Sequence, residues 1–372
     1  MNRQVSYFLT FVLDITFIIF LTLSGWHIVP TVFLVETVMW IVRLIWLSPP
    51  LLFFILRRLG HMIPIILSVV AIGFFLIQLA PGDIFSTMAM NPDIKQETLD
   101  RFREAFGLDK PWYVQFFKYL WNALHGNFGY SELFKAPVFT LVSQRALNTL
   151  LLAVLSFLLA WAFSIPAGII CATKQYKWQD QILSFLAFAG MSLPNFFLAF
   201  LIIYFISVTG NWLPIGGMHS VNVDSMNAIQ KLWDLIKHLV VPVFVLAVAV
   251  TAQLTRIIRA NMLEILGQQY ITTARSKGLK EKIVVTRHAL RNAINPMITI
   301  FGFQLGSLLG GAALVETVLA WPGLGKLILA ALLAQDLYLV VGSLIYGVAF
   351  LVIGNLIADI LLAIVDPRVR LS

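Results

Sequence analysis

The side chains best suited to polar chemistry in this sequence are concentrated in one basic segment, Gln268–Pro296. The rest of the chain is largely apolar, with 59% hydrophobic and only 12% charged residues overall. The pattern predicts a short helix, a break at Gly278, and a second helix rich in Lys and Arg that returns the chain to apolar sequence at Pro296. Glycine permits a backbone turn that a side chain would hinder. On charge alone, the segment could equally be an ordinary loop enriched in Lys and Arg.

The chain lacks the motifs that would let it catalyse a reaction by itself. It contains no G-x4-G-K-[ST] phosphate-binding loop, because Gly323–Lys326 lacks both the leading glycine spacing and the final hydroxyl. It contains neither H-E-x-x-H nor G-x-S-x-G. The six His residues are scattered and Cys171 is the only cysteine, so neither a metal site nor a disulfide framework is indicated. We therefore expect no cofactor, no metal and no enzymatic activity.

Composition indicates a helical membrane protein that crosses the bilayer several times. The mean hydropathy is +0.88, and the charged fraction is about half the ~25% typical of soluble domains. Continuous apolar runs of 18 or more residues predict spanning helices, and their lack of alternation argues against a barrel. We place six core spans near 57–80, 148–172, 181–208, 239–258, 293–315 and 338–363. Pro166 and Pro194 lie inside two of them and predict kinks.

Charge orients these spans. Lys and Arg greatly outnumber Asp and Glu in the segments at Arg57, 173–180, 256–291 and 366–372, whereas the two signs are nearly balanced in the opposite loops. The net charge of +8 thus lies on one side, which the positive-inside bias identifies as cytoplasmic. This orientation accounts for the basic composition, so we expect no nucleic-acid partner.

Residues 1–56 form a hydrophobic extension ahead of the core, 57–372. Val5–Leu23 and Ile28–Leu47 are each long enough to span, which would return the chain to the cytoplasmic side before Arg57. The segment lacks the basic cluster and cleavage site of a signal peptide. Two interpretations remain open, a peripheral hairpin packed on the bundle and an interfacial or partly disordered segment.

The loop 82–147 is predicted to be external and to contain two helices. The first follows Asn91-Pro92, and the second runs from Pro111 to Gly126. The second helix is heavily aromatic, which suits a membrane–water boundary. It would lie on the bilayer or serve as a docking platform for a soluble partner.

The basic segment and the loops around it resemble ABC-transporter permeases of the peptide (dipeptide/oligopeptide) importer family. In the segment itself the matching residues are Tyr270, Thr273, Ala274, Arg275, Lys277, Gly278, Leu279, Arg287, His288, Ala289, Leu290, Arg291, Asn292 and Ala293. Further matches follow in order along the chain. They are Leu79–Asp83, Phe106–Pro111, Gln115, Gly126–Ser131, Pro137-Val138, Arg145, Thr149-Leu150, Ser192–Phe196, Leu213–Gly217, Gly310–Ala312, Val315–Val318, Trp321–Gly325, Asn355-Leu356, Asp359 and Asp366–Arg368. Their order and spacing over more than three hundred residues are similar to the first permease subunit of the pair.

The resemblance implies an all-α polytopic membrane protein with the type I ABC importer transmembrane fold. It implies a multi-pass protein of the bacterial cytoplasmic (inner) membrane that works by alternating access. Its partners would be a second homologous permease, two cytoplasmic ATP-binding subunits or domains, an external solute-binding protein, and membrane lipid. The segment 259–292 would be the coupling loop on which an ATPase subunit pushes. Ala274 would then offer a small side chain to a cleft on that ATPase.

Some positions depart from the family pattern. Thr272 stands where the subfamily usually has Arg, and Gln269 where it usually has an acid. Gln335–Tyr338 replaces a common R-D-x-P, and Leu362 replaces a frequent Tyr. These departures leave the cargo open among dipeptides, longer peptides, a nickel chelate, glutathione and sugars.

The fifth span contains a glycine repeat with the spacing that lets helix backbones approach closely. Its helix-packing or pathway candidates are Gly302, Gln304, Gly306 and Gly310, and Asn355 in the last span is a further candidate. The glycines would pack either within this chain or against the companion permease. An ion-coupled secondary transporter is the alternative function, but it needs an acidic relay in mid-membrane and the core spans offer only Asp359 near one end. An intramembrane enzyme lacks any catalytic constellation.

Overall fold

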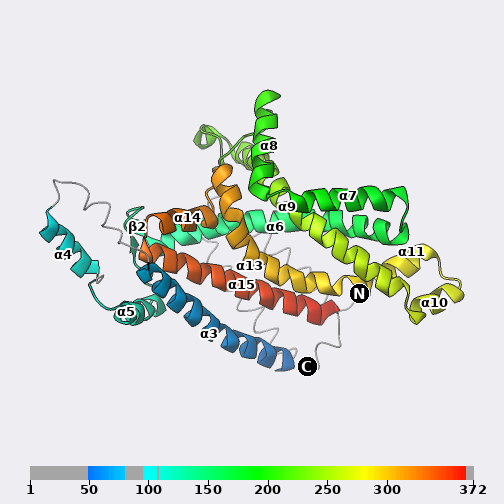
Figure 1. Cartoon of the computed structure of the whole chain (residues 1–372), viewed down its shortest axis with the longest axis horizontal. Helices are drawn as coiled ribbons and strands as arrows, with labels where there is room; N and C mark the ends of the chain where they lie inside the picture. Colours follow the sequence, from blue (N-terminus) through cyan, green and yellow to red (C-terminus); the bar gives the residue numbers. More distant parts are fainter. Residues whose placement is uncertain (1–48, 80–94, 107–108, 211, 366–372) are drawn as a thin grey trace.

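The computed structural model describes residues 49–79, 95–106, 109–210 and 212–365. The two predicted spans of the extension, Val5–Leu23 and Ile28–Leu47, lie outside this part of the chain. Among the described residues, the regular structure is helical apart from one two-stranded hairpin, as expected for an all-α membrane protein. Its long helices run side by side along the long axis of the molecule (Figure 1).

The main bundle is built from five long helices. They are α3 (Pro49–Leu79), α6 (Val138–Thr173), α9 (Ala228–Leu266), α13 (Asn295–Val318) and α15 (Leu337–Val365). Helix α6 packs most extensively on α9, while α15 packs on both α13 and α3. Among the described residues, α6, α9 and Leu337–Asp359 of α15 are long and apolar enough to cross a membrane by themselves.

Several helices extend beyond the predicted spans. Helix α6 begins at Val138, ten residues before the expected start, and α9 continues from Ala228 to Leu266 instead of covering only 239–258. A capping box starts α9, because the Asn227 side chain accepts from the Gln230 backbone and the Gln230 side chain accepts from the Asn227 backbone. Hydropathy marks the stretch compatible with lipid, whereas a cap of this kind marks where the helix begins.

The third predicted span, 181–208, is broken near the kink that Pro194 predicts. The chain forms α7 (Trp178–Ser192) and α8 (Asn195–Val208), which meet at an angle of 100°. Leu193 and Pro194 are both extended, with ψ of 123° and 135°. Proline has no N–H to donate and disfavours helical geometry in the residue before it, so the predicted kink becomes a full break. Helix α8 therefore projects sideways from the bundle (Figure 1).

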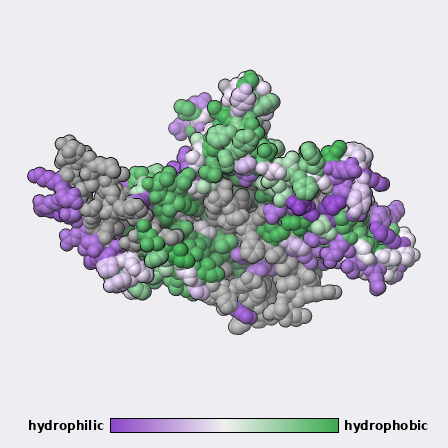
Figure 2. Space-filling model, in the orientation of Figure 1, coloured by the Kyte–Doolittle hydropathy of each residue, from purple (hydrophilic) through white to green (hydrophobic). Residues whose placement is uncertain are grey.

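The two ends of the bundle carry the shorter elements. One end holds α4 (Gln96–Phe106), α5 (Trp112–Leu124), α14 (Leu324–Leu333), and an antiparallel hairpin of β1 (Tyr130–Ser131) and β2 (Ala136–Pro137). The other end holds α10 (Gln269–Ser276) and α11 (Glu281–Ile283), followed by a π-helical turn η3 (Val284–Ala289) and α12 (Leu290–Ala293). A 3₁₀ turn, η2 (Val223–Ser225), precedes α9. Hydrophilic residues gather at both ends and hydrophobic ones cover the middle (Figure 2).

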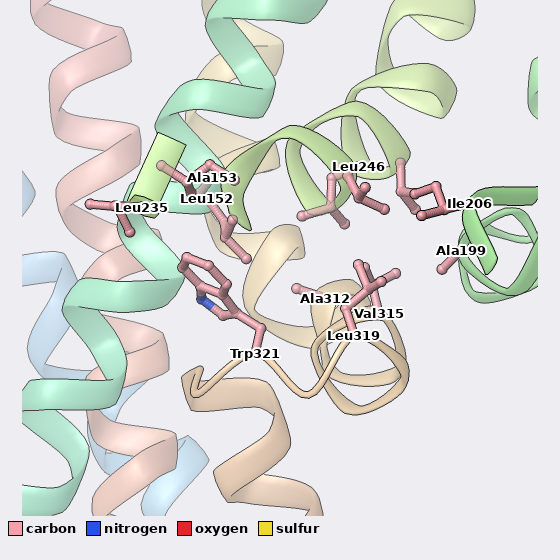
Figure 3. Packing of buried hydrophobic residues seen from close by; sticks show 13 residues of the cluster. Leu152, Ala153, Ala199, Ile206, Leu235, Leu246, Ala312, Val315, Leu319 and Trp321 are labelled. Carbon is pink, nitrogen blue, oxygen red and sulfur yellow. The ribbon is translucent and has the colours of Figure 1, made fainter. Parts of the chain in front are cut away.

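One buried cluster joins α6, α8, α9 and α13 around Trp321 (Figure 3). Leu152 of α6, Leu246 of α9 and Val315 of α13 are all at most 1% exposed, and Trp321 is completely buried. Its indole N–H donates to the Asn148 carbonyl at 3.3 Å, which satisfies the one polar atom of the ring. This cluster fixes the base of α8 to the bundle.

Candidate functional site

Helix α10 stands at the end of the bundle on the continuation of α9. Of its eight residues, Ile271 and Ala274 are buried, and the others are exposed. These two belong to a buried cluster that also contains Met262 of α9, Val284 and Ala289. A helical spacing of three residues places both side chains on one face. Helix α10 is therefore anchored on one side by its own chain and open on the other.

This orientation corrects the expectation for Ala274. The side chain is 7% exposed and packs inside the loop, so it does not present itself to an outside partner. The residues opposite the Ile271–Ala274 face are Gln269, Thr272, Thr273 and Ser276, all exposed and all uncharged. Hydroxyl and amide groups thus form the outward surface of α10.

Gly278 ends α10 in the predicted way. Its φ is +75°, in the left-handed region that favours glycine. Its N–H donates to the Arg275 carbonyl at 2.9 Å, and the Leu279 N–H donates to the Ala274 carbonyl at 3.4 Å. No atom lies within 4 Å of the position a Cβ would take, so the requirement at this residue comes from the backbone conformation and not from crowding.

An ion pair closes the turn. Arg275 donates from Nη2 to Glu281 Oε1 at 2.7 Å and from Nε to Oε2 at 3.2 Å. The guanidinium lowers the pKa of the Glu281 carboxyl, and the carboxylate raises the pKa of Arg275. Both side chains are substantially exposed, so the pair contributes little to stability and mainly sets the direction in which the chain leaves α10.

The second half of the loop, which returns the chain to the bundle, is not the single regular helix that the sequence predicts. A π-helical turn, Val284–Ala289, interrupts it between α11 and α12. The turn directs Val284, Val285 and Ala289 into the buried cluster under α10. Asn292 then donates to the Tyr270 hydroxyl at 2.9 Å, and Asn261 of α9 donates to the Ala293 carbonyl at 3.3 Å. Helix α10 is thus held at both ends.

The remaining predicted coupling residues lie on this loop as well. Lys277 and Leu279 flank Gly278 and are exposed. Thr273 donates to the Gln269 carbonyl at 3.0 Å. The structure therefore brings all seven residues, Tyr270, Thr273, Ala274, Arg275, Lys277, Gly278 and Leu279, into one compact element.

A buried ion pair joins α9 to α7 close to this element, and sequence reasoning missed it. Arg259 donates to both carboxylate oxygens of Asp180, from Nε at 2.8 Å and from Nη2 at 2.9 Å. Asp180 also accepts from the Tyr176 N–H at 3.0 Å and from the Ser184 hydroxyl at 3.2 Å. The Asp180 side chain is 5% exposed, so its charge is balanced by four donors inside the protein. The two residues are 79 positions apart, and no local pattern relates them.

At the opposite end of the bundle, several residues of the family resemblance meet around one buried carboxylate. Glu316 is fully buried and accepts from the Thr149 hydroxyl at 2.6 Å and the Lys326 N–H at 2.9 Å. The Thr149 oxygen in turn accepts from the Leu324 N–H at 2.7 Å. A Cβ at Gly323 would lie 2.1 Å from the Glu316 carboxylate, so only glycine fits there. These contacts fasten α14 to α6 and α13.

The pathway candidates are only partly described. Gly302, Gln304, Gly306 and Gly310 lie on α13, but their side-chain surroundings fall outside the described residues. Asn355 lies on α15 and is half-buried. Their packing and pathway roles stay predictions.

Comparison with known proteins identifies the architecture. Residues 164–371 match the family described as binding-protein-dependent transport system inner membrane component, and residues 51–165 match the N-terminal model of the same system. The chain belongs to this family. It is a membrane-spanning permease component of an ABC importer, with an all-α fold, and it is a transport subunit rather than an enzyme. Such permeases reside in the bacterial inner membrane.

Relatives of this permease cover most of the chain. The oligopeptide transport system permease protein AppB of Bacillus subtilis (strain 168) is 43% identical over 317 residues, which is 85% of this chain and 98% of AppB. The dipeptide transport system permease protein DppB of Escherichia coli (strain K12) is 36% identical over 333 residues, with the same two coverages. A putative peptide transport system permease protein of Brucella abortus (strain 2308) is 38% identical over 316 residues, again covering 85% and 98%.

Proposed function

We propose that this permease imports peptides and that the loop around α10 is where an ATP-hydrolysing partner acts on it. The peptide cargo is supported by the relatives named above as peptide transport permeases, which are 36–43% identical over 85% of the chain. The complete importer would contain a second homologous permease, two cytoplasmic ATP-binding subunits or domains, and an external solute-binding protein. Alternating access would pass the peptide from the binding protein to the cytoplasm.

The construction of α10 is the observation that supports the coupling role. Helix α10 is fixed to its own loop by its buried face, by the left-handed Gly278, and by the Arg275–Glu281 and Asn292–Tyr270 side-chain bonds. It therefore cannot change its angle independently of α9. A force on its outward face is therefore passed to α9 and, through Arg259 and Asp180, to α7. The outward hydroxyl and amide groups offer hydrogen bonds to a protein surface without the desolvation cost of a charge.

Cross-linking tests this assignment directly. With Cys171 replaced by Ala, single cysteines at Thr272, Thr273 or Ser276 should form cross-links to the ATP-binding subunit in the assembled importer. A cysteine at Lys280, on the same loop but beyond Gly278, is the matched control and should cross-link less. If cysteines at the three outward positions give no cross-link to the ATPase while the importer is active, the coupling role of α10 is wrong.

Topology provides an independent check. We expect Lys280 to be cytoplasmic and Lys118 to be external, because the basic segments lie on one side of the membrane. Single cysteines at the two positions would be exposed to a membrane-impermeant thiol reagent in intact cells. Labelling should occur at position 118 and appear at 280 only after the cells are opened. The reverse pattern would invert the orientation.

A further inference from the structure

Helix α5 has three distinct sectors around its axis. The first sector packs on the protein: the Phe116 and Tyr119 rings lie 5.8 and 5.4 Å from the ring of Phe74 on α3, and Tyr119 stacks on Tyr338 of α15 at 6.1 Å. These contacts fix α5 at the end of the bundle opposite α10 (Figure 1). The helix therefore has a defined rotation relative to the spans.

The second sector of α5 is apolar and has no protein contact that would bury it among the described residues. Tyr113, Phe117, Trp121 and Leu124 are 52, 66, 67 and 81% exposed. They recur at intervals of three or four residues, so they form one continuous stripe along the helix. Four large apolar side chains at this exposure, on an otherwise well-packed helix, indicate a non-aqueous neighbour.

The third sector is polar. It contains Gln115, Lys118 and Asn122, with His125 at the C-cap, and a hollow beside it is also lined by Lys110 and Tyr338. Gln115 donates to the Lys110 carbonyl at 2.7 Å, which ties this side of α5 to its own N-terminal turn. At 100° per residue, the apolar and polar sectors flank the packed sector on its two sides. A helix at a membrane boundary beside a bundle has this order: protein on one side, lipid on the next and water on the third.

The apolar stripe continues onto the surface of a membrane helix. The Trp112 ring links the two surfaces, because its centre lies 6.2 Å from that of Tyr113 in the stripe and 6.3 Å from that of Phe75 on α3. Phe75 and Leu79 are themselves 49 and 65% exposed. Ile63–Phe75 of α3 is apolar, and α3 packs on α15, part of which is long and apolar enough to cross a membrane, so we expect the outer surface of α3 to face lipid. The stripe of α5 is therefore an extension of a lipid-facing surface, and aromatic side chains are the residues that membranes favour at this depth.

We propose that α5 is an interfacial helix whose stripe, Tyr113, Phe117, Trp121 and Leu124, inserts into the lipid leaflet at the end of the bundle opposite α10. Lys118 and Asn122 then face water, and α5 seals the junction between α3, α15 and the bilayer surface. The occupant of the stripe is lipid rather than the soluble binding protein, because the stripe is continuous with α3 and contains no charge.

Spin labels measure this arrangement residue by residue. Single cysteines at 117, 118, 121 and 122, made in a Cys171→Ala background, would be labelled in the full-length permease reconstituted into phosphatidylcholine–phosphatidylglycerol vesicles. Collision rates with oxygen, which concentrates in lipid, and with a water-soluble nickel chelate are then compared. We expect oxygen collisions to exceed nickel collisions at 117 and 121, and the ratio to invert at 118 and 122.

Two outcomes would overturn the proposal. Nickel collisions that dominate at 117 and 121 would show that the stripe faces water. Nickel accessibility at 117 and 121 that falls only when a soluble binding protein is added would identify the stripe as a protein-docking surface. Neither outcome depends on the identity of the cargo or on the coupling role of α10.

Discussion

Replacing Gly278 by proline is expected to abolish peptide uptake while leaving the permease in the membrane. Proline fixes φ near −65°, whereas Gly278 has a φ of +75°. It also removes the N–H that donates to the Arg275 carbonyl. The turn would open and the Arg275–Glu281 pair would separate, so α10 would lose its fixed angle to α9. Uptake and substrate-stimulated ATP hydrolysis in the reconstituted importer should fall together by at least about tenfold, which corresponds to a loss of at least about 1.4 kcal/mol in coupling.

Graded substitutions distinguish a specific backbone requirement at Gly278 from a general disruption of the loop. Gly278→Asn should be mild because asparagine tolerates the left-handed region, and Gly278→Ala should be intermediate because alanine pays about 1–2 kcal/mol there. Ala274→Asp should resemble Gly278→Pro, because it buries an unpaired charge in the cluster under α10. Lys280→Ala, on the same loop but exposed, is the matched control. Normal coupling in Gly278→Pro would contradict the role assigned to this turn.

Breaking the Asp180–Arg259 pair should produce the second large effect. Asp180→Ala would leave the Arg259 guanidinium, 28% exposed, without its carboxylate, and also leave the Tyr176 N–H and Ser184 hydroxyl without their acceptor. Removing one partner of a buried pair costs about 3–5 kcal/mol, and the partial exposure of Arg259 favours the lower end of that range. The thermal unfolding midpoint in detergent should fall by several degrees.

The neighbouring arginine provides a control on the same helix face. Arg256, one turn earlier on α9, lies over the Phe188 ring of α7 at 4.8 Å and contacts Met191 instead of a carboxylate. Arg256→Ala should therefore lower the midpoint much less than Asp180→Ala. If uptake per ATP hydrolysed also falls in Asp180→Asn, where the shape is kept, the pair transmits movement as well as stabilising the fold. Equal stability of Asp180→Ala and the unmodified permease would exclude the stabilising role, and normal uptake per ATP hydrolysed in Asp180→Asn would exclude the transmitting role.

The sequence predicted those features that depend on local chemistry. The left-handed turn at Gly278 and the end of α5 before Gly126 both follow from residues whose backbone preferences decide the conformation. The sequence also allowed the family motifs to be recognised in their order along the chain. Three of the matched residues, Thr149, Glu316 and Gly323, meet at one site in the structure. Their contact could not be read from spacing, because Thr149 and Glu316 lie 167 residues apart.

Features that depend on packing were missed or misjudged. Pro194 predicts a kink, but the 100° angle depends on what α8 packs against after the break. Ala274 matches the motif, yet which face of α10 turns inward is decided by Met262, Val284 and Ala289. Hydropathy located the spans but not the ends of α6 and α9, since a helix continues into water wherever caps and neighbouring helices support it.

The length of α6 and α9 has a mechanical consequence. They contain 36 and 39 residues and pack along each other, so each is far longer than a bilayer core of about 30 Å requires. A helix of α6's length is a rod of about 54 Å, and rotating such a rod by about 5° around one end moves the other end by about 5 Å, close to one helical turn. A small rotation of α6 and α9 near α10 would thus move their far ends by several ångströms. A shift of that size is large enough to exchange one set of side-chain contacts for another.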